Sequence, residues 1–158
     1  MSNNVIAQLQ LRDYFLLLLN VEANPAFVRK EGEPIPSNMG VNFNFFRKGK
    51  EAKFKIELDV VVNPNDEDFK KSEYRIRIKM ESYLEFDFSV SEKDISSLLI
   101  PNGLAMTYSI ARGIVGQATG TSLHGKFLLP AVNFIELIKQ KIETEQKKNT
   151  KTTKSKKP

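Results

Sequence analysis

Strict alternation of apolar and charged side chains is the feature that most constrains the fold of this chain. In residues 54–62, and again in residues 74–90, every second side chain is apolar and most of those between are charged. Only Ser82 interrupts the apolar face of the second run. A period of two is typical of an antiparallel strand with one face buried and one in water. Residues 63–66, with the sequence NPND, are a strong turn signal, so the two runs predict neighbouring strands.

Two further strands are expected earlier in the chain. Residues 41–45 alternate and are closed by a turn at residues 47–50. Residues 6–21 are apolar on both faces, with Leu9, Leu11, Phe15, Leu17, Leu19 and Val21 on one and Tyr14, Leu16 and Leu18 on the other. Such a strand is buried by its own helices, joined to a second protomer, or left available to a binding partner. Residues 22–40 form a long connection rich in proline and glycine.

The last third of the chain has a helical pattern. Pro101 and Asn102 predict a helix start, followed by an apolar stripe at Leu104, Tyr108, Ala111, Val115 and Ala118. A second stripe of small residues comprises Ser109, Gly113, Gly116 and Gly120. An interior glycine costs roughly 1 kcal/mol relative to alanine, so this stripe indicates either close packing against a second copy in an oligomer or a frayed helix. Another helix begins at Asn133, which forms a capping-box-like pair with Glu136.

This order of elements predicts the fold class and the domain limits. Four strands followed by two helices favour an α+β fold, a four-stranded antiparallel sheet with two C-terminal helices packed on one face. Residues 1–145 are expected to form the domain, and residues 146–158 a disordered Lys-rich tail, because that tail has no apolar side chain. The net charge is +5, and residues 139–158, with eight lysines and two glutamates, contribute +6 of it. The tail therefore either aids solubility or makes weak, salt-sensitive contacts with RNA, acidic partners or anionic lipid.

Composition argues against most catalytic chemistry. The chain has no cysteine, which excludes disulfides and thiolate metal sites, and His124 is its single histidine. We therefore predict no enzyme, with no catalytic residue, no metal and no cofactor. There is no apolar run of about 18 residues, as a membrane helix requires, and no basic-then-apolar leader at the N-terminus. The predicted location is cytoplasmic.

Two segments carry a resemblance to a known family. Ala111-Arg112 is followed, after an interval, by the sequence FLLPAVNF at residues 127–134, and residues 22–25, EANP, end the first strand. In these segments and in element order, the chain resembles the SecB family of ATP-independent chaperones over roughly residues 8–140. The resemblance implies a holdase for unfolded polypeptides and a homotetramer, a dimer of dimers. In such a tetramer, the first long helix of each chain would pack at the dimer–dimer interface, which agrees with the small-residue stripe.

The resemblance also implies apolar grooves that bind unfolded segments. The candidate groove residues are Leu16, Leu18, Phe27, Val28, Phe43 and Phe45, with Met106 and Leu128 as less central ones. Ordinary core packing is the alternative for each, above all for Phe43 and Phe45. Binding of this kind requires only exposed apolar area, since each buried Å² contributes about 25 cal/mol.

Departures from the family pattern concern export. Members that serve protein transport dock a SecA-type translocation motor through carboxylates on the outer sheet face. Glu22 matches one such position, but Leu18 stands where another acidic residue is expected, and Gly32 lies near the place of a groove tryptophan. Client holding is therefore better supported than motor docking. The alternative is a non-export SecB-like protein dedicated to one partner, such as an antitoxin, or an adaptor with the same fold.

Overall fold

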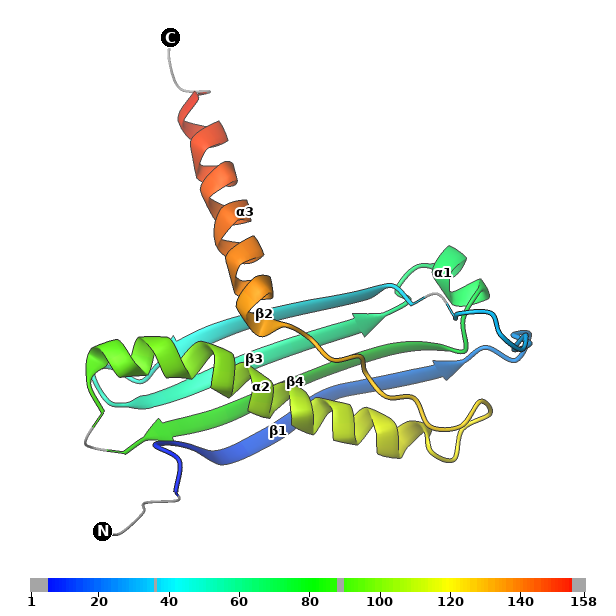
Figure 1. Cartoon of the computed structure of the whole chain (residues 1–158), viewed down its shortest axis with the longest axis horizontal. Coiled ribbons are helices and arrows are strands. Elements are labelled where there is room, and N and C mark those ends of the chain that lie inside the picture. Colours follow the sequence, from blue (N-terminus) through cyan, green and yellow to red (C-terminus); the bar gives the residue numbers. More distant parts are fainter. Residues whose placement is uncertain (1–5, 36, 88–89, 155–158) are drawn as a thin grey trace.

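The computed structural model describes residues 6–35, 37–87 and 90–154. Four antiparallel strands form one sheet in the spatial order β1-β4-β3-β2. Their bounds are β1 Leu9–Ala23, β2 Met39–Arg47, β3 Lys53–Val62 and β4 Tyr74–Phe86. A short helix, α1 (Asp66–Lys70), lies in the turn between β3 and β4; α2 (Glu92–Thr119) covers one face of the sheet, and α3 (Phe134–Lys154) projects from the body (Figure 1). The predicted α+β fold with a four-stranded antiparallel sheet is confirmed.

The core lies between α2 and the sheet face formed by the alternating runs. The apolar side chains of β3 and β4 that share this face are buried, as the alternation predicts. Ser82, the polar interruption, is also buried, and its hydroxyl lies 2.5 Å from the Thr107 hydroxyl of α2. Thr107 also donates to the carbonyl of Gly103, so this buried pair is satisfied. The final part of the predicted run includes Phe88, which lies outside the described residues.

The first long helix begins earlier than the sequence pattern predicts. Ser91 is its N-cap, and the Ser91 hydroxyl accepts the backbone N–H of Asp94 at 3.2 Å. Ser91 and Asp94 have the spacing of a capping box, a signal that could have marked this start. Pro101 lies inside α2, where it removes one backbone hydrogen bond, and Figure 1 shows the helix changing direction along its length. The predicted start at Pro101 is wrong because the cap and the burial of Ile95 and Leu99 extend the helix backwards.

The predicted apolar stripe of α2 is confirmed in four of its five positions. Leu104, Tyr108, Ala111 and Val115 are buried against the sheet. Ala118 is exposed, and Thr119 is buried in its place. Thr119 can occupy the core because its hydroxyl donates to the carbonyl of Val115 at 2.8 Å, which satisfies its polar atom.

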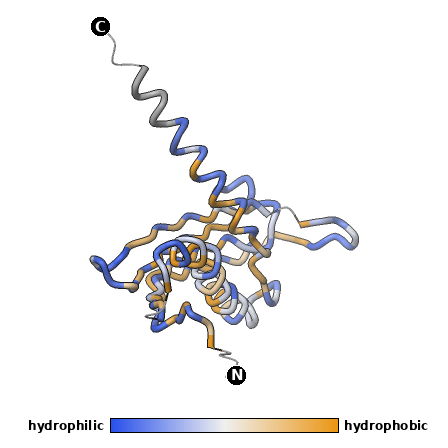
Figure 2. The backbone as a smooth tube through the Cα atoms, turned by 60° about the vertical axis from the view of Figure 1, so that its left-hand side comes forward, coloured by the Kyte–Doolittle hydropathy of each residue, from blue (hydrophilic) through white to orange (hydrophobic). Residues whose placement is uncertain are grey.

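The helix α3 starts as predicted and then leaves the body. The backbone N–H of Glu136 donates to the Asn133 side chain at 3.2 Å. Phe134, Leu137 and Ile138 pack against the core, and beyond them Figure 2 shows a mostly hydrophilic helix extending away from the sheet. The backbone is helical to Lys154, across part of the segment for which the sequence predicts disorder. That disorder stays a prediction.

Candidate peptide-binding surfaces

Two bulges determine which way the side chains of β1 point. The pairing of β1 with β4 shifts between Leu11 and Asp13 and again between Leu16 and Leu18. A bulge inserts one residue, so it reverses the face on which the following side chains lie. Leu16 consequently aligns with buried Met80 and faces α2, whereas Leu18 aligns with Lys79 on the opposite, outer face.

The face assignments predicted for β1 are therefore wrong in part. Phe15 aligns with Glu81 on the outer face and does not share the side of Leu9 and Leu19. Leu16 and Leu18 lie on opposite faces, not on one. Neither bulge could be predicted from a period of two, because a bulge is a property of the pairing between two strands.

The β1 strand forms an open sheet edge that is apolar on both faces. Residues 14–18 are five successive apolar side chains, each between 39% and 57% exposed. An edge strand offers unpaired backbone N–H and C=O groups to a further strand. Asp13 satisfies one of these donors, because its carboxylate accepts the N–H of Tyr14 at 2.8 Å. The remaining apolar stretch makes β1 a candidate surface for strand pairing.

The opposite edge, β2, is blocked at its centre. The N–H of Phe43 donates to the side chain of Asn42 at 3.0 Å, and the ammonium group of Lys141 on α3 donates to the Phe43 carbonyl. The same ammonium group lies 4.2 Å from the centroid of the Phe43 ring. Charged side chains placed on an edge hinder the addition of another strand. The two edges of this sheet therefore differ in their availability.

A second candidate surface lies where the chain crosses over from β1 to β2. The His124 ring packs edge-to-face against Phe27 and Tyr74, each at 5.7 Å between centroids, and its Nε2 lies 2.7 Å from the carbonyl oxygen of Asn24. The side-chain amide of Asn24 donates to the carbonyls of Phe69 and Ser72. The His124 contact joins the crossover to the turn that follows α2, and the Asn24 amide joins it to the segment between β3 and β4.

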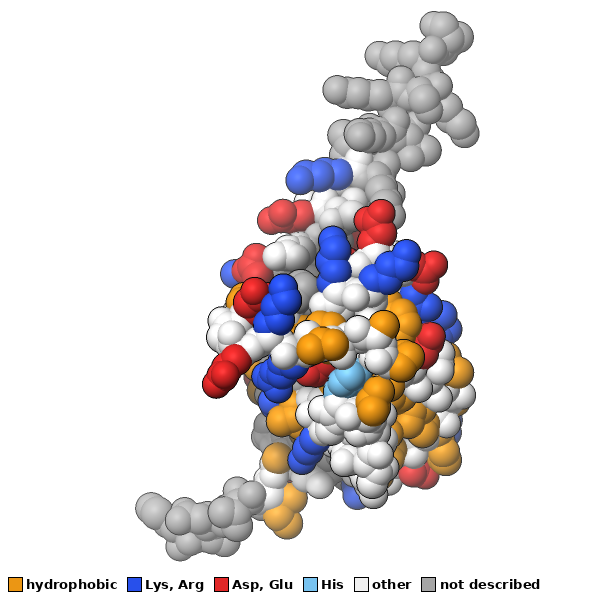
Figure 3. All heavy atoms as spheres, turned by 90° about the vertical axis from the view of Figure 1, so that its right-hand side faces the viewer, with side chains coloured by type: hydrophobic (Ala, Val, Ile, Leu, Met, Phe, Trp, Pro, Cys, Tyr) orange, Lys and Arg blue, Asp and Glu red, His pale blue; other side chains and the backbone are white. Residues whose placement is uncertain are grey.

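Apolar side chains close to the contact between Asn24 and His124 remain exposed. Val28 is 79% exposed and Leu123 66%, while Phe27 is half-buried. Figure 3 shows apolar side chains around the single histidine at this end of the molecule. We call Phe27, Val28, Leu123 and His124 the crossover cluster. Leu123 was missed by the sequence analysis, although an isolated leucine in a Gly/Ser-rich turn is a signal that could have found it.

The six predicted groove residues are not brought together into one groove. Phe27 and Val28 belong to the crossover cluster, and Leu18 lies on the outer face. Phe43 and Leu16 stand in one row across the sheet, through Leu58 and Met80, but at opposite edges. Phe43 is buried in the core, and Phe45, which packs edge-to-face against it, is half-buried. Met106 is half-buried and Leu128 is half-exposed.

The small-residue stripe of α2 divides into two parts. Gly116 is buried by its own chain, since a Cβ atom there would lie 3.1 Å from Leu128 Cδ2 and 3.2 Å from Lys126 Cε. Ser109, Gly113 and Gly120 are exposed. A Cβ at Gly113 would meet nothing within 4 Å, so packing within the chain does not account for that glycine.

Paired opposite charges cover most of the outer sheet face. Glu22 lies 3.5 Å from Arg75, Asp59 binds Arg77 at 2.9 Å, and Lys55 binds Glu57 at 2.7 Å. The hydrogen bond from Arg77 lowers the pKa of Asp59, and the hydrogen bond to Glu57 raises the pKa of Lys55. Asp59 and Lys55 therefore stay charged near neutral pH. In these three pairs, each carboxylate is balanced by one basic side chain.

Neither a metal site nor a membrane span is found in the described part of the chain. No three or more His, Asp or Glu side chains there are grouped as a metal site requires. None of the helices in those residues is long and apolar enough to span a bilayer.

The fold has a counterpart among solved structures. It matches Rv1957, a SecB-like chaperone of Mycobacterium tuberculosis solved with a ChAD peptide from the HigA1 antitoxin, with a TM-score of 0.57 and 13% identity, over 80% of this chain and 91% of that chain. This chain has a SecB-like fold. A protein of unknown function from Streptococcus agalactiae also matches, with a TM-score of 0.46 and 16% identity, over 78% of this chain and 97% of that one. No family model and no curated protein gives a match.

Proposed function

We propose that this SecB-like protein is an ATP-independent chaperone that holds unfolded or non-native polypeptides in the cytoplasm. The observation that carries the proposal is the crossover cluster, an exposed apolar surface next to the hydrogen bonds of Asn24 and His124, which anchor it to the body. Ordering the surface in advance lowers the entropy cost of binding. Apolar contact has little directional preference, so such a surface accepts many sequences. No catalytic step and no cofactor are involved.

We further propose that the chain works as a homotetramer, a dimer of dimers. The open β1 edge would pair with the β1 edge of a second copy and cover residues 14–18, which contribute roughly 1 kcal/mol each on burial. The β1 edge is the better candidate, because backbone groups at the centre of the β2 edge are already bonded to Asn42 and Lys141. The exposed Ser109 and Gly113 of α2 would then allow close approach of helices between dimers.

Light scattering tests the holdase proposal. Two unrelated denatured proteins are diluted into buffer with and without the chaperone, with no nucleotide added. We expect suppression of aggregation for both, and a weaker effect from Val28→Asp, which places a charge in the crossover cluster. Ile142→Asp on α3 is the matched control, because Ile142 is 49% exposed and lies outside that cluster. A protein that suppresses neither aggregation would contradict the proposal.

A dedicated partner is the second candidate function. The SecB-like chaperone with the similar fold was solved with an antitoxin peptide, which supports a role in protecting one fixed client. Such a protein would protect its partner and leave both unrelated denatured proteins to aggregate. Export through a SecA-type motor has less support, since Glu22 already contacts Arg75 and the outer face carries paired charges of both signs.

A further inference from the structure

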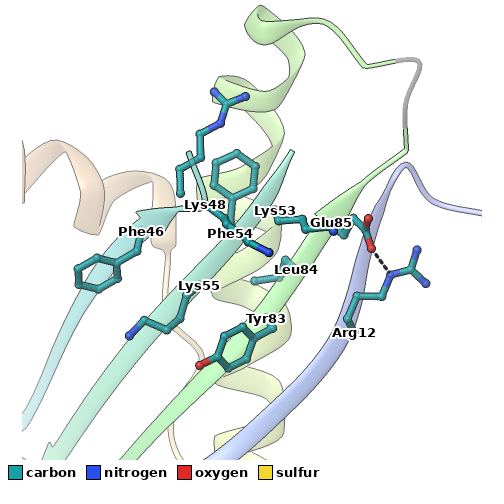
Figure 4. A pocket seen from close by; sticks show the side chains of 10 residues that line it. Arg12, Phe46, Lys48, Lys53, Phe54, Lys55, Tyr83, Leu84 and Glu85 are labelled. Atoms are coloured by element: carbon teal, nitrogen blue, oxygen red, sulfur yellow. Dashed lines mark hydrogen bonds and ion pairs between the residues drawn. The ribbon is translucent and has the colours of Figure 1, made fainter. Parts of the chain in front are cut away.

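A pocket that shares no residue with the crossover cluster lies at one end of the sheet, lined mostly by side chains of the outer face. It has a volume of about 560 Å³ and lies near the turn between β2 and β3, and all four strands contribute to it (Figure 4). Its lining residues include Phe46 from β2, Lys55 from β3, Tyr83 from β4 and Arg12 from β1. In Figure 4 the side chains of Phe46, Lys55 and Tyr83 project from the same side of the sheet.

Two exposed aromatic rings contribute to the apolar lining of this pocket, together with the buried Phe54 and Leu84. Phe46 is 46% exposed and Tyr83 38%. The ammonium group of Lys55 lies 4.6 Å from the Phe46 ring centroid, and Phe15 packs edge-to-face on Tyr83 at 5.8 Å. The Tyr83 hydroxyl donates to Glu81 at 3.1 Å, which orients its ring. Exposed aromatic rings on a sheet face offer contact area to a partner side chain.

Five basic side chains and one carboxylate, Glu85, line the pocket. Two of these cations are paired with carboxylates outside the lining: Arg47, on the α2 side of the sheet, binds Glu92 at 2.8 Å, and Lys55 binds Glu57 at 2.7 Å. Arg12 pairs with Glu85 at 2.8 Å. Lys53 and Lys48 share a single carboxylate, that of Glu51, at 3.1 and 3.9 Å. The β2–β3 end of the pocket therefore has more ammonium groups than carboxylates to neutralise them.

We propose that this pocket binds an acidic peptide segment of a partner protein, with an aromatic or leucine side chain on the exposed rings of Phe46 or Tyr83, on either side of Lys55, and carboxylates beside Lys48 and Lys53. Complementary charge favours an acidic partner. A nucleic acid fits less well, because its continuous phosphates would meet the carboxylates of Glu57, Glu81 and Glu85 on the same face. A peptide can place its acidic residues at separate positions.

Fluorescence anisotropy with a labelled peptide of alternating glutamate and phenylalanine tests the proposal on the full chain. We expect saturable binding that weakens as salt is added. The double variant Lys48→Ala/Lys53→Ala should bind about tenfold more weakly, since two charge contacts are lost. Phe46→Ser should also weaken binding. Lys79→Ala is the matched control, because Lys79 lies on the same sheet face and does not line the pocket.

Three further binding measurements, with a lysine peptide, with Val28→Asp and with an oligothymidylate, complete the test. A peptide with lysine in place of glutamate should not bind, and Val28→Asp, which alters the crossover cluster, should leave binding of the acidic peptide unchanged. Circular dichroism of each variant confirms that the fold is retained. Equal binding of the lysine peptide, stronger binding of an oligothymidylate, or full binding by the double-lysine variant would overturn the proposal.

Discussion

At the scale of single residues, Tyr108 joins α2 to the segment that runs back over it. Its hydroxyl donates to the carbonyl of Pro130 at 2.6 Å, and its ring packs edge-to-face on Phe134 at 5.4 Å. Burial raises the pKa of Tyr108 to about 12, whereas an unfolded tyrosine titrates near 10. Between about pH 10 and pH 12, Tyr108 therefore stays protonated in the folded state and is deprotonated in the unfolded chain.

The variant Tyr108→Phe tests both effects. Losing the hydrogen bond should lower the free energy of unfolding by about 1 kcal/mol near neutral pH. The proton-linked stabilisation in the wild type is complete below about pH 10 and is lost as the pH rises toward 12. The variant should therefore lose less stability than the wild type across that range, as measured by urea unfolding. Parallel losses in the two proteins would contradict the assignment.

At the scale of elements, the bulge at Leu17 decides which apolar side chains of β1 lie on the α2 face and which on the outer face. Deleting Leu17 should leave the pairing on both sides of the bulge intact, because Leu16 and Leu18 already align with adjacent residues of β4. Deleting Leu19 should be more destabilising, because Asn20 would move into the position opposite buried Ile78. Thermal unfolding followed by circular dichroism compares the two deletions. A lower melting temperature for the Leu17 deletion would argue against the bulge.

The distal part of α3 is expected to add little to the stability of the domain. Side chains that pack on the core end at Ile138, and Lys141 is the contact with the β2 edge. Removing residues 146–158 should change the free energy of unfolding by less than about 0.5 kcal/mol, as expected for a surface change. Urea unfolding of residues 1–145 measures this, and amide exchange in the full chain tests the predicted disorder. A large loss of stability would show that the distal helix packs on the body.

At the scale of the whole molecule, the asymmetry between the two sheet edges predicts how copies assemble. Leu16→Lys at the β1 edge should reduce the mass in solution, because a charge would be buried in the proposed interface. Gly113→Leu should reduce it as well, while the monomer fold is kept, since a Cβ there meets nothing within 4 Å. Asn44→Lys on the blocked β2 edge is the control. Unchanged mass in both test variants, measured by light scattering, would contradict the proposed tetramer.

Much of this fold could be predicted from local patterns. The alternation in β3 and β4, the end of β3 at residues 63–66 and the Asn133 cap follow from side chains close together in the chain, whereas the helix α1 in that connection was not predicted. The start of α2 could also have been found, because Ser91 and Asp94 carry a capping signal. The candidate surfaces were predicted less well. Val28 is an exposed member of the crossover cluster, but Leu123 and the pocket residues Phe46 and Tyr83 were not identified.

The sequence by itself determined which residues alternate, where the chain turns and which helices are capped, because these depend on contacts between near neighbours. Only the tertiary structure decided which strands are edges, since strand order depends on pairing between distant segments. It also decided that Leu16 and Leu18 lie on opposite faces, because the bulges arise where β1 must fit the register of β4. The protection of the β2 edge by Lys141 also depends on the tertiary structure, because Phe43 is distant from Lys141 in the sequence and close to it only in the folded chain.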